Sequence, residues 1–90
     1  MQTLVKKNSL KRLKTISGHL NHIIKAVEED RYCIDILQQS SAVQSALRSF
    51  DGVILKGHLE EHASMAMSKK GGEREKAIQE IVDTFKKTRI

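Results

Sequence analysis

The segment "ILQQSSAVQSALRSFDGVI", residues 36–54, carries the pattern that decides the fold. Its apolar and small side chains recur at alternating steps of four and three residues, at Ile36, Ser40, Val43, Leu47, Phe50 and Ile54. This spacing is typical of helices that pack side by side in a bundle. Gly52 and Gly57 each cost a helix interior about 1 kcal/mol relative to alanine, but no strong turn signal lies near them. The pattern therefore predicts one long helix over about residues 32–65.

A shorter helix is predicted on each side of this segment. The first, over about 9–29, has its apolar residues at similar steps, at Leu10, Leu13, Ile16, Leu20, Ile23 or Ile24, and Val27. Asn8 or Ser9 is expected to cap it, after a flexible basic arm over 1–8, and the polar run "EEDR" ends it. The third, over about 73–87, follows a glycine pair and carries Ala77, Ile78, Ile81, Val82 and Phe85 on one face. The fold class is all-α, in a single domain over 1–90.

Composition limits the class of protein. A chain of 90 residues without proline and with only two Phe and one Tyr buries little core, so we expect it to associate with copies of itself. One cysteine cannot form an internal disulfide, which favours a reducing compartment. No stretch has the pattern of a signal peptide or a membrane span, so the sequence predicts a soluble, cytoplasmic protein.

Positive charge is concentrated at the start of the chain. The net charge is +5, yet residues 1–27 contain six basic residues and no acidic one, which leaves −1 for the remainder. A localised basic segment indicates a nucleic-acid partner or an anionic membrane surface, and a solvated helix face is the alternative. The segment contains no Trp or Phe, the residues that anchor helices on membrane surfaces.

Candidate metal ligands lie near the two ends of the predicted long helix. The stretch "GHLEEH" sets His58 and His62 four residues apart, and Cys33 precedes His58 by 58 − 33 = 25 residues. At about 1.5 Å per residue, 25 residues span roughly 37 Å, so the thiol and the imidazoles cannot meet within one helix. They can meet if two copies of the helix cross antiparallel near Ala46 and Leu47. A two-fold dimer would then contain two equal sites, each with one sulfur and two nitrogens.

The chemistry of these side chains suits a soft or borderline metal ion. Thiolate and imidazole together bind Cu(I), Zn(II), Co(II) and Ni(II), whereas Mg(II) prefers oxygen. The alternative is that Cys33 is an inert buried thiol and both histidines are ordinary surface residues. A thiol enzyme is not expected, because no residue in the pattern provides an oxyanion hole or orients a base.

Four motifs, "RLKT..GHL", "EDRYCIDIL", "SAVQSAL" and "HLEEH", lie within a match that runs from about Leu10 to Asp83, most of the chain. Together they resemble the CsoR/RcnR family of bacterial metal-sensing transcriptional repressors. The resemblance implies a three-helix protomer, an antiparallel dimer with a four-helix-bundle core, and a homotetramer built as a dimer of dimers.

The resemblance also implies a set of ligands. The three ligand positions of the family fall on Cys33, His58 and His62, and copper sensors usually have cysteine at the third. Imidazole in that place leaves Ni(II), Co(II) and Zn(II) as alternatives to Cu(I). Tyr32 and Glu80 match the residues that surround the ligands in copper sensors and orient them. Nickel/cobalt sensors add a histidine near the N-terminus, and residues 1–18 contain none. Cu(I) is therefore the favoured ion.

The function that the resemblance implies is repression released by metal. The metal-free protein is expected to bind double-stranded operator DNA, and Cu(I) is expected to release it and so derepress metal efflux or resistance genes. No helix-turn-helix pattern is present, so we expect broad phosphate contacts and reading of DNA shape. The candidate contact residues are Arg12, Lys14, Lys11, Lys6, Lys7 and Arg48. Ser17 stands where the family typically has arginine.

Two assignments stay open at this point. His19 and His22 lie on or beside the basic helix and are expected to be surface or interface residues without metal. A metal-storing or metal-trafficking bundle that does not bind operator DNA, and a bundle that binds membrane surfaces, are the alternatives to a repressor. Binding to operator DNA with a steep salt dependence would separate a repressor from both.

Overall fold

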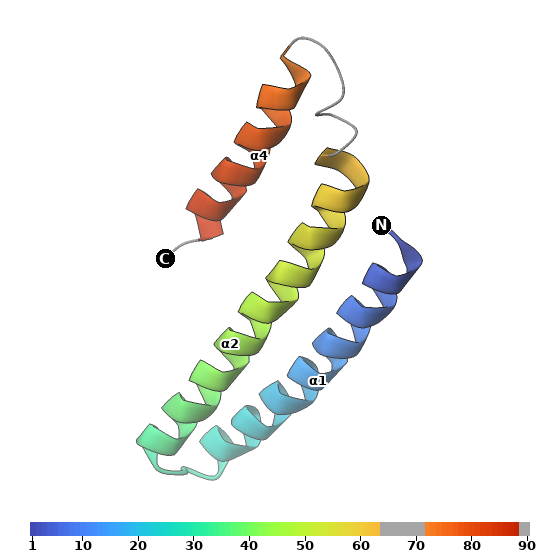
Figure 1. Cartoon of the computed structure of the whole chain (residues 1–90). Coiled ribbons are helices and arrows are strands. Elements are labelled where there is room, and N and C mark those ends of the chain that lie inside the picture. Colours follow the sequence, from blue (N-terminus) through green and yellow to red (C-terminus); the bar gives the residue numbers. More distant parts are fainter. Residues whose placement is uncertain (64–71, 89–90) are drawn as a thin grey trace. The chain divides into compact units, whose positions relative to one another are not determined.

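The computed structural model describes residues 1–63 and 72–88, and that part of the chain is helical (Figure 1). Its elements are the α-helices α1 (Thr3–Glu28), α2 (Cys33–His58) and α4 (Glu73–Thr88) and the short π-helix η1 (Leu59–Ala63). The prediction of an all-α, three-helix chain is confirmed. The chain divides into two units, Met1–Leu55 and Lys56–Ile90, which are considered separately. One domain over 1–90 stays a prediction.

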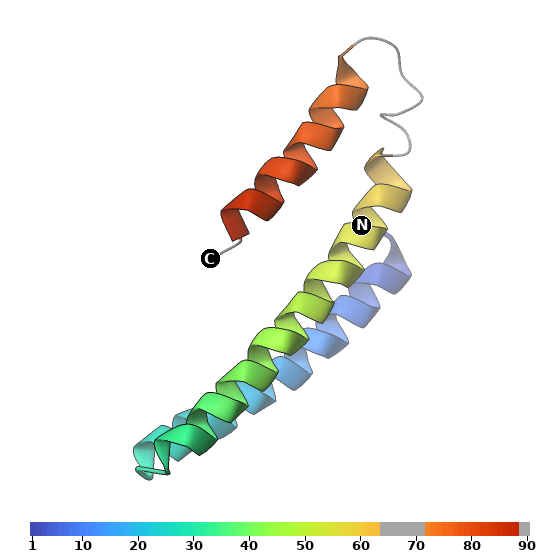
Figure 2. The ribbon, with the colours of Figure 1, turned by 60° about the vertical axis from the view of Figure 1, so that its left-hand side comes forward.

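In the first unit α1 and α2 form an antiparallel hairpin, and both views show them side by side (Figures 1 and 2). The chain reverses at the predicted polar run, where Asp30 has a φ of 55°, a left-handed conformation that Asp adopts more readily than most residues. The backbone N–H of Arg31 donates to the carbonyl of Ala26 over 2.9 Å. The N–H groups of Asp35 and Ile36 both donate to the carbonyl of Tyr32. These bonds satisfy backbone groups that the two helix ends would otherwise leave unpaired.

The start of α1 differs from the prediction. The helix begins at Thr3, so the expected flexible arm over 1–8 was wrong. Gln2 occupies the N-cap position without a side-chain capping bond, and Asn8 lies inside the helix, where its Oδ1 accepts a hydrogen bond from the Nε of Arg12 over 3.1 Å. The physical reason is that the first eight residues contain no glycine or proline, and leucine and lysine are good helix formers.

The apolar residues of α1 form two lines rather than one. The buried and half-buried line is Val5, Ser9, Ile16, His19, Ile23 and Ala26. It faces α2, whose buried and half-buried residues include Ile36, Ser40, Val43, Ala46 and Phe50. The second line is exposed and consists of Leu10, Leu13, Leu20, Ile24 and Val27. Of the stripe predicted for the first helix, only Ile16 and Ile23 therefore turn inward, because the hairpin covers one side of the helix.

Ser9 is the buried polar residue of this hairpin. Its side chain is 5% exposed, and its Oγ has no hydrogen-bond partner among the described residues. An unpaired buried hydroxyl costs about 1–3 kcal/mol, and alanine is also the better helix former. We therefore predict that Ser9→Ala raises the free energy of unfolding by about 1 kcal/mol, measured by urea denaturation.

The matched control for this prediction is Ser45→Ala on α2, where the serine is exposed. That change gains helix propensity alone, about 0.5 kcal/mol or less. A lower stability of Ser9→Ala than of the wild-type protein would contradict the prediction, since it would mean that the hydroxyl is hydrogen-bonded in the protein in solution.

The long helix is confirmed up to His58. α2 passes through Gly52 without a break, and a Cβ added there would meet no atom within 4 Å. The α-helix ends at His58, and the chain continues as η1 to Ala63. The predicted end near residue 65 lies outside the described residues.

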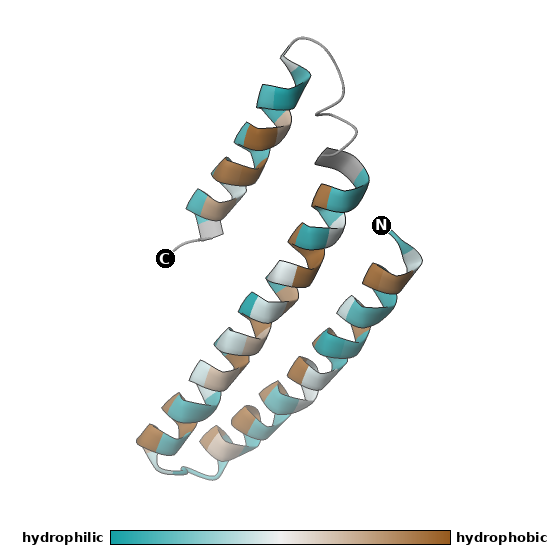
Figure 3. Ribbon diagram, viewed as in Figure 1, coloured by the Kyte–Doolittle hydropathy of each residue, from teal (hydrophilic) through white to brown (hydrophobic). Residues whose placement is uncertain are grey.

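The second unit contains η1 and α4, which contact each other. α4 carries the predicted apolar face (Figure 3), with Ala77 and Ile81 half-buried and Ile78, Val82 and Phe85 exposed. Its bounds agree with the predicted 73–87 to within one residue. No helix in the described part of the chain is both long and apolar enough to cross a membrane.

Candidate metal and DNA-binding sites

Cys33 is the first residue of α2, and its thiol is free and exposed. The turn at Asp30 places it there, because the backbone reverses over residues 29–32 and α2 begins directly afterwards. Within this chain the thiol is therefore not buried, contrary to that part of the alternative. Tyr32, the preceding residue, is 69% exposed. The sulfur is accessible to a group from outside the hairpin.

His58 and His62 follow one another across a change of helix type. His58 is the last residue of α2 and is half-buried, and the backbone of His62 lies within η1. The sequence predicted both on one continuous α-helix and contained no signal for the π-helix. Single π-helical turns occur frequently at functional sites, and this turn contains one of the two histidines.

Among the side chains that the structure describes, those of residues 1–61 and 72–87, no three His, Cys, Asp or Glu lie close enough together to hold a metal ion. The side chain of His62 is not among them. Cys33 and His58 are the first and last residues of one 26-residue helix. The fit to a metal therefore rests on the donor set, one thiolate and two imidazoles, which suits Cu(I), Zn(II), Co(II) and Ni(II).

Two residues were predicted to surround the ligands. Tyr32 lies in the first unit and Glu80 on α4 in the second, and both are exposed. The carbonyl of Glu80 accepts a hydrogen bond from the hydroxyl of Thr84 over 2.8 Å. Their roles at the site stay predictions.

All six candidate DNA-contact residues are exposed, five on α1 and Arg48 on α2. Lys7, Lys11 and Lys14 are spaced by four and three residues, so they lie along one side of α1. Arg12 lies on another side of α1, beside a groove that Ala46 of α2 also lines, and its Nε donates to the Oδ1 of Asn8. The basic residues of α1 are therefore distributed over more than one side of the helix.

A shallow groove of about 330 Å³ lies between α1 and α2. It is lined by Asn8, Lys11, Arg12, Thr15, Ile16 and Ala46. Ala46 is half-buried and borders α1, whereas the sequence placed it at a crossing between two copies. Its neighbour Leu47 is 38% exposed and is the more accessible of the two.

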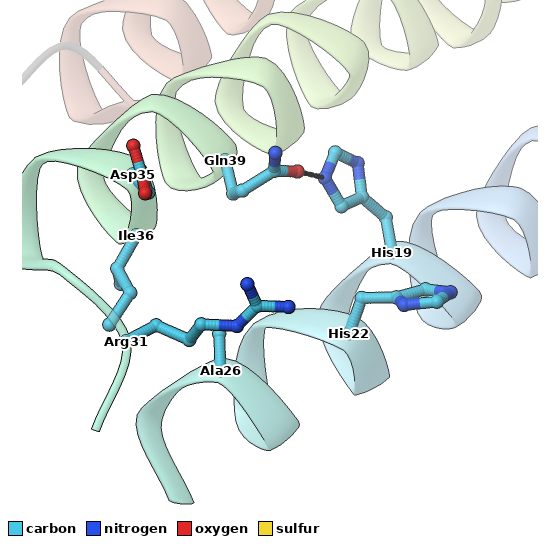
Figure 4. A pocket seen from close by; sticks show the side chains of 7 residues that line it. All are labelled: His19, His22, Ala26, Arg31, Asp35, Ile36 and Gln39. Atoms are coloured by element: carbon cyan, nitrogen blue, oxygen red, sulfur yellow. Dashed lines mark hydrogen bonds between the residues drawn. The ribbon is translucent and has the colours of Figure 1, made fainter. Parts of the chain in front are cut away.

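A second groove, of about 510 Å³, lies towards the turn of the hairpin (Figure 4). It is lined by His19, His22, Ala26, Arg31, Asp35, Ile36 and Gln39. The Nε2–H of His19 donates to the Oε1 of Gln39 over 2.5 Å, which joins α1 to α2. The Nε of Arg31 lies 3.8 Å from the Oε2 of Glu29. Sequence reasoning missed Gln39, because nothing in the pattern pairs positions 20 residues apart.

Comparison with known proteins finds similar sequences over nearly the whole chain. Residues 5–87 match the family described as metal-sensitive transcriptional repressor. The copper-sensing transcriptional repressor CsoR of Mycobacterium tuberculosis (strain H37Rv) is 43% identical over 86 residues, 96% of this chain and 71% of its own. CsoR of Bacillus subtilis (strain 168) is 46% identical over 76 residues, 84% of this chain and 73% of its own.

A solved structure is similar in fold as well. The crystal structure of the copper-sensing repressor CsoR with Cu(I) from Geobacillus thermodenitrificans NG80-2 has a TM-score of 0.85. It is 37% identical in sequence, and the match covers 97% of this chain and 88% of that one. The family that the motifs resembled is therefore also the family found by comparison of sequence and of fold.

Proposed function

This chain belongs to the CsoR family of metal-sensitive transcriptional repressors. We propose that the metal-free protein binds operator DNA and represses transcription, and that binding of Cu(I) releases the protein from the DNA. Release would derepress genes for metal efflux or resistance. As a repressor it is not an enzyme, as the sequence predicted. We expect it to act in the cytoplasm, where operator DNA lies.

The observation that carries this proposal is the likeness to a repressor solved with Cu(I), at a TM-score of 0.85 and 37% identity. The relatives named above are also described as copper-sensing. One thiolate with two imidazoles accommodates Cu(I), which does not require a fourth ligand, so the donor set is compatible with this ion. Together these observations favour Cu(I) over Ni(II), Co(II) and Zn(II), although His62 replaces the usual cysteine.

The proposed ligands are Cys33 of one protomer with His58 and His62 of its partner. This arrangement depends on a long helix without a break at Gly52, and α2 is continuous there. An antiparallel pair of such helices brings the first residue of one beside the last residue of the other. The exposed apolar line on α1, from Leu10 to Val27, offers a surface that a second copy would cover. We propose a dimer on this basis, and a tetramer of two dimers by analogy with the family.

The proposed DNA surface consists of the basic residues of α1 together with Arg48 of α2. Its lysines and arginines are exposed, and cations of this kind bind phosphates and release counterions from DNA. For about 6–10 phosphate contacts, affinity should fall by roughly 10³–10⁵ between 50 and 200 mM salt. A metal-storing or metal-trafficking bundle would bind Cu(I) without this salt-dependent operator binding.

The experiment that tests the function is a titration of Cu(I), Ni(II), Co(II) and Zn(II) into the protein bound to a fluorescent duplex of its own upstream DNA. We predict that Cu(I) lowers the affinity for this duplex by about 5–150-fold, the usual range of allosteric coupling, measured by anisotropy. A random duplex of equal length is the control. Release by none of the four metals would refute the proposal, and release by Ni(II) but not Cu(I) would refute the choice of metal.

A further inference from the structure

A polar pair, half-buried His19 and exposed Gln39, lies at the edge of the apolar interface between α1 and α2. On α1 the inward line runs Ile16, His19, Ile23, so an imidazole occupies a place where both neighbours in the line are isoleucine. His19 is half-buried, and its Nε2–H donates to the Oε1 of Gln39 on α2 (Figure 4). A polar residue at a seam position usually lowers stability relative to an apolar one and specifies how the helices align. Positions where a polar residue interrupts an otherwise apolar helix face are expected to be functional more often than others.

The pair is placed between the two proposed binding surfaces. Gln39 follows Cys33 by 39 − 33 = 6 residues on the same helix, which is about 9 Å along its axis. His19 lies on α1 between Lys14 and Lys25. The hydrogen bond therefore connects the part of α2 that begins with the proposed sulfur ligand to the middle of the basic helix.

This bond differs in kind from the other interactions around it. The side-chain bonds of Arg12 with Asn8 and of Gln44 with Ser40 each join residues of one helix. Ile16 and Val43, the buried apolar residues, are 6% and 5% exposed, and apolar contacts have no directional requirement. A hydrogen bond weakens steeply with distance and angle. A small shift of the first turns of α2 thus changes this bond far more than it changes the apolar packing.

We propose that the His19–Gln39 hydrogen bond couples the metal-bound state of α2 to the position of α1, and hence to its affinity for operator DNA. His19 and Gln39 act as positioning residues that touch neither the metal nor the DNA. The proposal rests on the proposed function, since coupling requires that metal and DNA favour different arrangements of the two helices. When Cys33 is drawn towards a ligand set on a partner, the first turns of α2 shift and Gln39 carries the shift to His19.

The test is a double-mutant cycle with His19→Leu, Gln39→Leu and the double variant. The measured quantity is the ratio of operator dissociation constants with and without Cu(I). We expect this ratio to fall towards 1 in each single variant, from about 5–150 in the wild-type protein, and to fall no further in the double variant, because both changes remove one interaction. His19→Gln keeps an N–H donor and is expected to recover part of the ratio.

The matched control is His22→Leu, which alters the same groove at a residue three positions along the helix. Its ratio should equal that of the wild-type protein. A merely structural role for the pair would lower the melting temperature and weaken operator binding equally with and without Cu(I), and an unchanged ratio would overturn the proposal. A wild-type ratio of 1 would instead refute the proposed function, so the two failures are distinguishable.

Discussion

Cys33→Ala is expected to abolish release by Cu(I) while operator binding without metal stays within about twofold of the wild-type protein. The thiol is exposed at the first residue of α2, so its removal should leave little strain and no cavity. The proposed site then retains only two imidazoles and loses the donor that most favours Cu(I). Operator affinity measured by anisotropy in the presence and absence of Cu(I) gives both quantities in one experiment.

A matched control is Ser45→Ala, a similar truncation of an exposed side chain on α2. That variant should bind operator DNA and respond to Cu(I) as the wild-type protein does. Loss of operator binding in Cys33→Ala would point to a structural role for the thiol. Undiminished release by Cu(I) would remove Cys33 from the set of ligands.

Mixing Cys33→Ala with His58→Ala is expected to restore Cu(I) sites that neither variant has alone. In an antiparallel dimer each site takes its sulfur from one protomer and its imidazoles from the other, so a mixed dimer contains one complete site and one empty one. With random association, half of the dimers are mixed, and about one quarter of the wild-type sites should return. Competition with a colorimetric Cu(I) chelator after subunit exchange measures their number.

In the control mixture, Cys33→Ala is combined with a double variant that carries both Cys33→Ala and His58→Ala. No dimer in that mixture contains a complete site. His58 has an interaction within its own chain and is half-buried. The melting temperature of His58→Ala must therefore be measured before the mixing experiment. His62→Ala offers a second route to the same mixture. If the mixture binds no more Cu(I) than the separate variants, the ligands do not come from two protomers.

Much of the fold follows from local spacing. The steps of four and three through Val43 and Phe50 predicted a helix, and α2 runs without a break through Gly52. Helical periodicity is a property of the backbone and needs no knowledge of neighbours. The same local reasoning failed at residues 3–8, where the chain continues as helix although no apolar stripe requires it.

The candidate site likewise has features that the sequence shows and features that only the structure shows. The residue types and spacing of Cys33, His58 and His62 are visible in the sequence, and so is the excess of lysine and arginine before residue 28. The π-helix that contains His62 was not predictable, because no residue pattern specifies where an α-helix changes to a π-helix. The ligation by two protomers was reached from the length of the helix and stays a proposal.

By itself, the sequence predicted a helical chain with one thiol and two imidazoles near the ends of a long helix, and its motifs resembled those of metal-sensing repressors. Only the tertiary structure decided which apolar residues face α2, that Ala46 borders α1, and that His19 donates to Gln39. The physical reason is that a helix presents several sides. Which of them is buried, and which distant residue a polar group meets, depends on the alignment of two helices that the turn at Asp30 brings together.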